Sequence, residues 1–332
     1  MSRRKNNAVH PLTLALVNIS RIIVGLLFIF SGVVKLIDPK GSQYKFEEYF
    51  SAGVLNLESL VPYALYLSIF LIVLEIYLGF AVLLGYRAKA ILKYLLLLIL
   101  FFLFLTWYSA YFNKVTDCGC FGDAIKLTPW QSFYKDLILT ILIVFLYRYK
   151  ENIYPFFNKK TVIFITVSSF ILSIFIAVFV IRHLPLKDFR AYKIGTDIRE
   201  GMQYKGDGKI PPIHDLMLED EQNDLLDTIL KMDKVMLVIA SSLEKSEFTG
   251  FTEVKNAAIQ AKKKGYKVYG ATASFSEIIQ ITSKKYDLPF EFLFCDATTL
   301  KTMIRANPGV ILLKKGVITD KKAWRDVENL NY

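Results

Sequence analysis

Residues 12–37 read LTLALVNISRIIVGLLFIFSGVVKLI, an apolar run in which only Arg21 and Lys35 carry charge. About 20 helical residues cross the roughly 30 Å hydrocarbon core of a bilayer, so this run is long enough to span one. It is longer than the apolar region of a secretory signal and has no convincing small-residue cleavage site. We therefore predict a retained transmembrane helix after a short N-terminal segment, residues 1–11.

Four more apolar runs follow the first one. They are Leu60–Gly85, Ala90–Phe112, Phe133–Tyr147 and Thr161–Ile181. The chain of 332 residues is 54% hydrophobic, above the 45–50% of typical soluble domains, but the part after Pro185 is polar and rich in lysine. The composition therefore indicates a membrane region followed by a domain in water.

Basic residues gather in three short segments beside the apolar runs. They are Arg3, Arg4 and Lys5, then Arg87, Lys89 and Lys93, then Arg148, Lys150, Lys159 and Lys160. With five spans these segments share one side of the membrane, which the positive-inside rule makes cytoplasmic. We predict a multi-pass protein of a bacterial inner membrane with a cytoplasmic N-terminus and a periplasmic C-terminal domain. The net charge of +11 is explained by these loops, and we expect no nucleic-acid binding.

Two charged residues lie inside the first two spans. Arg21 and Glu75 are each nine or ten residues from the expected cytoplasmic end, and each has a glycine four residues later, Gly25 and Gly79. Isolated charges at this depth are costly, and small residues let helices approach closely. We predict an Arg21–Glu75 ion pair between the two helices, either as structural glue or as part of a polar cavity. Lys35 is expected to snorkel to the outer interface.

The loop after the third span contains the heptapeptide Asp117-Cys118-Gly119-Cys120-Phe121-Gly122-Asp123. With the topology above it faces an oxidising compartment, where a disulfide is stable. A bridge across Cys118-Gly119-Cys120 closes a very short ring, which stabilises a fold little, and a distorted bridge is easier to reduce. Cys118 and Cys120 are therefore candidates for a redox pair, with the other five residues in support.

Two other interpretations of the heptapeptide stay open. The cysteines could be buried as small apolar residues in a re-entrant turn, or bind a metal together with Asp117 and Asp123. Structural zinc sites prefer richer sets of Cys and His, and the three histidines show no ligand spacing, so we predict no metal.

Residues 12–150 resemble the DoxX/MauE family of four-helix membrane proteins. The resemblance rests on Arg21-x3-Gly25, Gly32-x2-Lys35-x2-Asp38-Pro39, Glu75-x3-Gly79, Gly85 and Cys118-Gly119-Cys120-Phe121-Gly122. It implies a four-helix bundle, here with a fifth span at 161–182, and a role in maturing a disulfide-rich exported enzyme. The bundle is also similar in outline to quinone reductases that form disulfides. Those carry Cys-x-x-Cys, which is absent here, so a quinone cofactor is a weak expectation.

After a breaker-rich segment predicted as a linker, 183–212, strands and helices alternate over 213–332. Strands are expected at Val235–Ala240, Tyr266–Ala271, Phe290–Phe294, Val310–Leu313 and Val317–Thr319. Helices are expected at Leu216–Met232, 250–264, Glu277–Tyr286, Thr298–Arg305 and Lys321–Leu330. This order, with Asn307-Pro308 before the fourth strand, resembles thioredoxin-like α/β domains.

The residues that follow the first strand are Ser241-Ser242-Leu243-Glu244, where redox members of that fold carry Cys-x-x-Cys. The domain is therefore not expected to run dithiol exchange alone. The resemblance implies a client-binding edge beside Pro308. Cys295 is expected to be either an inert core thiol or a partner for the heptapeptide.

These observations predict an integral membrane protein in thiol–disulfide redox or in the maturation of exported proteins. The lipid bilayer is one partner, and an exported client or a quinone is another. The alternative is a scaffold without catalysis whose outer domain binds a partner, so enzyme status stays open. A transporter that uses Arg21 and Glu75 is less favoured, because the spans are not broken.

Overall fold

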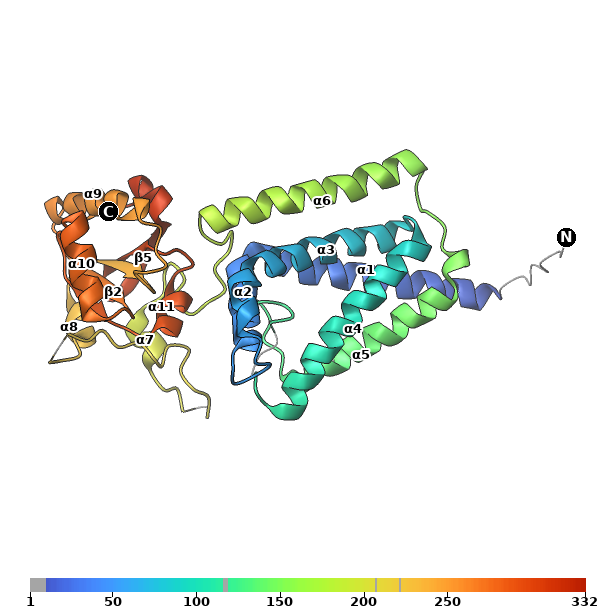
Figure 1. Cartoon of the computed structure of the whole chain (residues 1–332), viewed down its shortest axis with the longest axis horizontal. Helices are drawn as coiled ribbons and strands as arrows, with labels where there is room; N and C mark the ends of the chain where they lie inside the picture. The colour runs from blue at the N-terminus through green and yellow to red at the C-terminus, as the bar shows by residue number, and fades with distance from the viewer. Residues whose placement is uncertain (1–9, 116–118, 207, 221) are drawn as a thin grey trace. The chain divides into compact units, whose positions relative to one another are not determined.

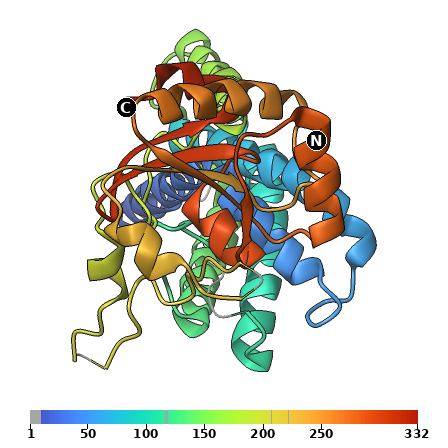
Figure 2. The ribbon, with the colours of Figure 1, turned by 90° about the vertical axis from the view of Figure 1, so that its left-hand side faces the viewer.

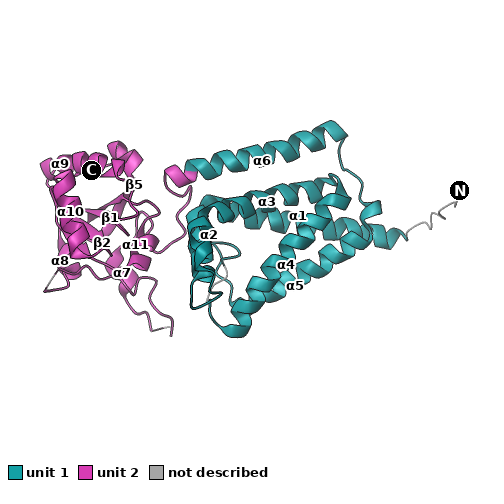
Figure 3. Ribbon diagram, in the orientation of Figure 1, with its two compact units in different colours: residues 1–179 teal, residues 180–332 magenta. Residues whose placement is uncertain are grey.

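The computed structural model describes residues 10–115, 119–206, 208–220 and 222–332. The chain divides into two compact units, residues 1–179 and 180–332 (Figure 3). Long helices make up the first unit, and the second contains a sheet with helices around it (Figure 1).

The first unit carries all the long apolar helices of the described residues. Its helices are α1 (Pro11–Ile37), α2 (Pro39–Phe50), α3 (Ala64–Leu84), α4 (Ala88–Phe112), α5 (Pro129–Arg148) and α6 (Lys159–Arg182), with 3₁₀ turns at Glu58–Tyr63 and Lys150–Asn152. Within the described ranges, five helices are long and apolar enough to cross a membrane, and they coincide with the five predicted spans. The predicted class of the first unit, a multi-pass helical bundle, is confirmed.

Glycines set the close approach of α1 and α3. A Cβ placed on Gly79 would come within 2.9 Å of the backbone nitrogen of Ile29, and one on Gly32 would meet Ile76 Cγ1 at 2.5 Å. The two helices therefore touch backbone to backbone, as small residues allow in membranes. Arg21, Gly25, Phe28, Gly32 and Lys35 are all buried on this face of α1, as their spacing predicts.

The segment between the first two predicted spans, 38–59, contains a helix, α2, for which the sequence analysis gave no prediction. Asp38 caps α2 by accepting from the Gly41 backbone N–H, and Pro39 occupies the first helical position, where no N–H donor is needed. Phe46, Tyr49 and Phe50 of α2 are buried in the core of the unit. Helix α2 thus covers the bundle at the end where α1 stops.

The second unit is a mixed sheet with helices on both faces (Figure 2, where this unit faces the viewer). Its elements are α7 (Ile198–Met202), α8 (Leu226–Lys231), β1 (Val235–Ala240), α9 (Thr249–Lys263), β2 (Lys267–Thr272), α10 (Ser276–Tyr286), β3 (Phe292–Phe294), α11 (Ala297–Met303), β4 (Gly309–Lys314), β5 (Val317–Ala323) and a 3₁₀ turn at Trp324–Asn329. Among the described residues the strand order is β3-β2-β1-β4-β5. β1 pairs in parallel with β2 and antiparallel with β4, which fits the predicted thioredoxin-like fold.

Alternate residues of the central strand β1 feed two separate cores. Val235, Leu237 and Ile239 join the cluster that includes α8 and α11, whereas Met236 and Val238 join the cluster beneath α9. Because both faces are covered, β1 is apolar throughout, as expected of a central strand.

Two predicted helices of this unit are wrong in part. Leu216–Met232 is helical only over α8, because Leu216 and Leu218 are buried two residues apart, as in an extended chain, and Glu219 bridges Phe294 of β3. The helix expected at Lys321–Leu330 is the end of β5 followed by the 3₁₀ turn.

The segment predicted as a linker, 183–212, packs into the second unit over part of its length. Ile198 lies in the core, and Asp188 is clamped by Arg190 and by Lys321 of β5, whose Nζ lies 2.7 Å from Asp188 Oδ2. Burial lowers the pKa of Lys321 to about 8, with a smaller contribution from Arg190. The glycines and prolines of 183–212 therefore indicate irregular backbone here, but the segment is not a flexible linker over its whole length.

Candidate functional site

The described part of the heptapeptide, residues 119–123, packs against the helices of the first unit. Gly119 and Gly122 adopt left-handed φ values of 65° and 52°, and the Gly122 N–H donates to the Gly119 carbonyl at 3.0 Å, which closes a tight turn. Phe121 is buried against Phe30 of α1, with ring centroids 5.4 Å apart. Cys120 and Asp123 are half-buried. Asp117 and Cys118 lie outside the described residues.

A buried ion pair lies beside this turn. Lys35 Nζ of α1 is 2.6 Å from Glu75 Oε1 of α3, and the two side chains are 10% and 2% exposed. Ser31 Oγ is 2.8 Å from Glu75 Oε2 and 2.9 Å from the Cys120 carbonyl oxygen. Lys35 also lies over the Phe102 ring, 4.7 Å from its centroid. The Ser31 hydroxyl thus connects the Cys120 carbonyl to the buried Glu75 carboxylate.

The predicted Arg21–Glu75 pair is wrong, and so is the snorkelling of Lys35. Arg21 donates to the Tyr154 carbonyl at 2.8 Å and to the Leu83 carbonyl at 3.2 Å, and it stacks 3.6 Å from the centroid of the Phe156 ring. It fastens the end of α3 to the segment before α6. Lys35 does not reach for the interface, because α2 covers this end of the bundle.

The physical reason lies in the register of two antiparallel helices. Gly25 packs against Gly79 and Leu83, and Gly32 packs against Glu75 and Ile76. Glu75 is therefore level with Ser31 to Lys35, while Arg21 is level with the end of α3. Arg21 and Glu75 are equally far from the predicted ends of their spans, but this similarity does not determine which residues of α1 and α3 lie side by side.

A second buried pair comes from α5. Lys135 Nζ lies 2.5 Å from Asp136 Oδ1, and Thr106 of α4 donates to Asp136 Oδ2 at 3.2 Å. Asp136 is 1% exposed, and Lys135 lies 5.3 Å from the centroid of the Phe121 ring. Sequence reasoning missed this pair, although a carboxylate inside an apolar span was a readable signal.

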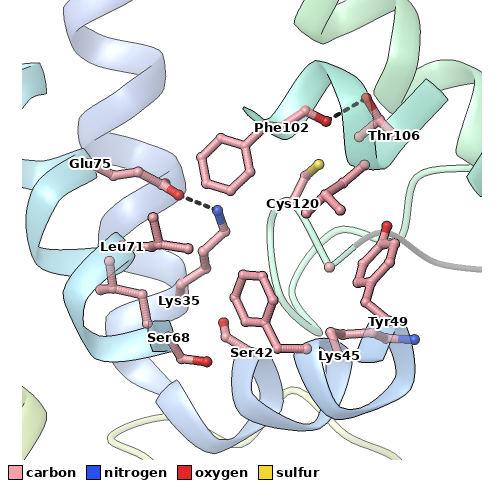
Figure 4. Close-up of a pocket in the computed structure, with 14 residues that line it drawn as sticks. Lys35, Ser42, Lys45, Tyr49, Ser68, Leu71, Glu75, Phe102, Thr106 and Cys120 are labelled. Atoms are coloured by element: carbon pink, nitrogen blue, oxygen red, sulfur yellow. Dashed lines mark hydrogen bonds and ion pairs between the residues drawn. The ribbon is translucent and has the colours of Figure 1, made fainter. Parts of the chain in front are cut away.

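These groups line two adjoining pockets that share Lys35, Glu75, Phe102 and Cys120. The larger has a volume of about 40 Å³ and is also lined by Ser42, Tyr49, Ser68 and Thr106 (Figure 4). The smaller has a volume of about 20 Å³ and reaches Ser31, Phe121, Lys135 and Asp136. Cys120 therefore lines a mainly apolar pocket that also contains two carboxylates and Lys35, all three buried, and the half-buried Lys135.

No set of three or more potential metal ligands comes together among the residues that the structure describes. The metal-binding interpretation of the heptapeptide involves Cys118 and Asp117, so it stays untested.

In the second unit, hydroxyl groups occupy the end of β1 beside Pro308. Ser242 and Ser274 each donate to Glu244 Oε2 at 2.7 Å, and these bonds lower the pKa of the Glu244 carboxyl. Asn307 donates to the Ser242 carbonyl at 2.9 Å, and the Asn307-Pro308 bond is cis. The edge thus keeps its shape without a thiol at Ser241–Glu244.

Cys295 follows β3 and is 1% exposed in the core of the second unit. Burial raises the pKa of its thiol to about 12. These properties are those of an inert core thiol and count against its role as an exchange partner.

Comparison with known proteins assigns the membrane part of the chain. Residues 13–148 match the family described as methylamine utilisation protein MauE. These residues form a MauE domain. It contains α1 to α5, and with them Lys35, Glu75, Cys120 and Lys135.

One relative is similar over more than the MauE domain. Protein TlpB of Flavobacterium psychrophilum is 26% identical over 258 residues, which cover 74% of this chain and 62% of that protein. The chain thus spans less than two thirds of the relative's length.

Proposed function

We propose that this chain is an inner-membrane protein that exchanges disulfides with exported proteins during their maturation, with Cys118 and Cys120 as the exchange pair. The observation that carries the proposal is Cys120 at a pocket that is also lined by the buried Lys35 and the half-buried Lys135. Nearby ammonium groups favour the thiolate, which is the form that attacks a disulfide. The place of Cys118 in this proposal comes from the sequence alone.

Topology supports the same conclusion. The heptapeptide follows the third span and the second unit follows the fifth, so an odd number of crossings separates each of them from the N-terminus. With the basic loops in the cytoplasm, both then lie in the periplasm, where disulfides persist.

The exchange balances between the pair and the client. One thiolate of the pair attacks a client disulfide, forms a mixed disulfide and releases a client thiolate. The second cysteine then attacks the mixed disulfide, which leaves an oxidised pair and a client with two thiols. The reverse sequence oxidises a client by the same bonds.

The second unit has the role of holding the client. Its edge beside Pro308 has serines and Glu244 at the end of β1, and large apolar side chains close by, with Phe275 82% exposed and Phe248 51% exposed. Such a surface suits non-covalent binding of a peptide, which leaves the covalent step to the heptapeptide.

Trapping tests the exchange. Cells that express Cys118→Ser or Cys120→Ser are quenched in acid, and adducts are separated without reductant. We expect a reductant-sensitive adduct with one single variant and none with the matched double variant. A scaffold without catalysis predicts no adduct in any of them, with both thiols of the unmodified chain permanently reduced.

Orientation has its own test. A membrane-impermeant maleimide applied to intact spheroplasts without detergent is expected to label Cys120, which is half-buried, in a Cys118→Ser chain. Labelling only after the cytoplasmic side is exposed would overturn the proposed topology.

A further inference from the structure

Ser31 stands between two acceptors and has one proton to give. Its Oγ is 2.8 Å from Glu75 Oε2 and 2.9 Å from the Cys120 carbonyl oxygen. With Glu75 ionised, the single hydroxyl proton cannot fully satisfy both contacts. With Glu75 protonated, Glu75 donates to Ser31 and Ser31 donates to Cys120, so both contacts are complete.

The pocket is also balanced in charge. Lys35 and Glu75 form one pair, and Lys135 and Asp136 form another. A thiolate at Cys120 would add a negative charge to a poorly solvated space, which is costly. That cost is avoided if the thiol proton stays in the pocket and a cation changes its partner.

We propose that Glu75 is the proton acceptor for the Cys120 thiol and that Lys35 changes its ion-pair partner from the Glu75 carboxylate to the thiolate. The S–H bond breaks, an O–H bond forms on a Glu75 carboxylate oxygen, and the pocket keeps its net charge. Ser31 is a positioning residue that holds the Cys120 backbone in register with Glu75. When a sulfur leaves as thiolate in the reverse step, Glu75 returns the proton. This inference rests on the proposed exchange, because it assigns the groups that ionise its thiol.

The shared pockets support the assignment. Lys35, Glu75 and Cys120 line both pockets (Figure 4 shows the larger). The other charged groups that line them are Lys45 of α2 and the Lys135–Asp136 pair of α5, while α4 contributes only the uncharged Phe102, Leu105, Thr106 and Ile99. Lys45 is paired with Glu48 and Lys135 with Asp136, so among the cations of the two pockets Lys35 is the one paired with Glu75.

The test measures alkylation of Cys120 by iodoacetamide in the full chain, purified in detergent in a Cys118→Ser background. The Cys120 peptide is quantified by mass spectrometry from pH 6 to pH 8, so Cys295 does not interfere. Lys35→Met removes the cation, and we expect the rate at pH 7 to fall about tenfold or more, as loss of a neighbouring opposite charge implies. Glu75→Gln removes the carboxylate that pairs with Lys35, so the Cys120 thiolate becomes the ion-pair partner of Lys35. We then expect a faster rate that varies by only about twofold across this pH range.

Opposite signs separate this mechanism from a structural pair. If the pair only holds the helices together, both variants loosen the same contact and shift the rate in the same direction, which would overturn the proposal. If either charge variant loses its gel-filtration peak, and so does not fold, Ser31→Ala is tested instead because it removes no charge. It is expected to slow alkylation about fivefold, as loss of one hydrogen bond implies, and an unchanged rate would count against the proposal.

The chain offers a matched control. Lys89 and Glu151 form a Lys–Glu pair of 2.9 Å at the surface, with side chains 67% and 62% exposed. Lys89→Met and Glu151→Gln are expected to leave the Cys120 rate unchanged. The alkylation assay uses neither Cys118 nor a client. The assignment of Glu75 as proton acceptor can therefore be refuted while an adduct is still trapped, and it can be supported while no adduct is trapped.

Discussion

Which carboxylate–cation pair joins α1 to α3 can be decided by a double-mutant cycle. The perturbations are Lys35→Met, Glu75→Gln and Arg21→Gln, singly and in the two pairs that include Glu75. Lys35 and Glu75 are in contact at 2.6 Å and are nearly fully buried, so breaking the pair leaves one uncompensated buried charge. Each single change is expected to cost about 3–5 kcal/mol. The double change removes both charges, so we expect a coupling energy of about 3 kcal/mol.

Arg21 gives the contrasting result. Its guanidinium bonds the Leu83 and Tyr154 carbonyls, and the packing of Gly25 and Gly32 places it some ten residues from Glu75 along the helices, roughly 15 Å at the helical rise. Sites this far apart add within about 0.5 kcal/mol. Arg21→Gln should still destabilise, by about 2–4 kcal/mol, because it loses two charge-assisted bonds to carbonyls.

The assay is reversible unfolding of the full chain in mixed micelles of increasing SDS fraction, followed by circular dichroism. A coupling above about 1 kcal/mol between Arg21 and Glu75, together with additivity for Lys35 and Glu75, would refute the register described here. That result would support the Arg21–Glu75 pair, which was predicted from the distance of each residue to the end of its span.

Three further outcomes are expected. Gly79→Ala should destabilise the bundle by about 1–3 kcal/mol in the same assay, because the added Cβ meets backbone at 2.9 Å, whereas Gly53→Ala, which has nothing within 4 Å, should be neutral. Cys295 should resist maleimide in the native chain at pH 8 and react after denaturation. Because burial raises its pKa from 9.0 to about 12, the native state keeps this proton longer, and Cys295→Ala should reduce the loss of stability above pH 9. Burial lowers the pKa of Lys321 from 10.5 to about 8, so the native state binds fewer protons between these values; thermal stability should rise from pH 8 to pH 9, and Lys321→Met should abolish that rise.

The sequence predicted what depends on one segment at a time. The length and apolarity of each span are local, so all five long helices were found. The same holds for β1 to β4, whose apolar runs lie between breakers. The position of Asn307-Pro308 before the fourth strand, β4, was part of a resemblance that covers the whole second domain.

What failed depends on how segments meet. Lys35 was expected at the interface because it lies near the end of the first predicted span, although Asp38-Pro39 is a helix start that could have been recognised. Glu75 was predicted to pair with Arg21 because both lie at a similar distance from the cytoplasmic ends of their spans. The register of α1 against α3 is fixed by the packing of Gly32 against Glu75, which the sequence does not show. Leu216 and Leu218 fitted a helical spacing and an alternating one equally, and the edge of β3 decided between them.

In the proposed function, the two units divide the requirements of exchange chemistry between them. A thiol that is to ionise inside a membrane bundle needs a cation and a place for its proton, and Lys35 with Glu75 meets both needs without adding charge. The second unit keeps the edge beside Pro308 but fills it with Ser242, Ser274 and Glu244, whose bonds to one another leave a polar and non-nucleophilic surface. A client held there cannot be trapped by a thiol of that edge. In the proposed exchange the covalent step is then left to the heptapeptide, because the second unit has no cysteine at this edge to compete for the client.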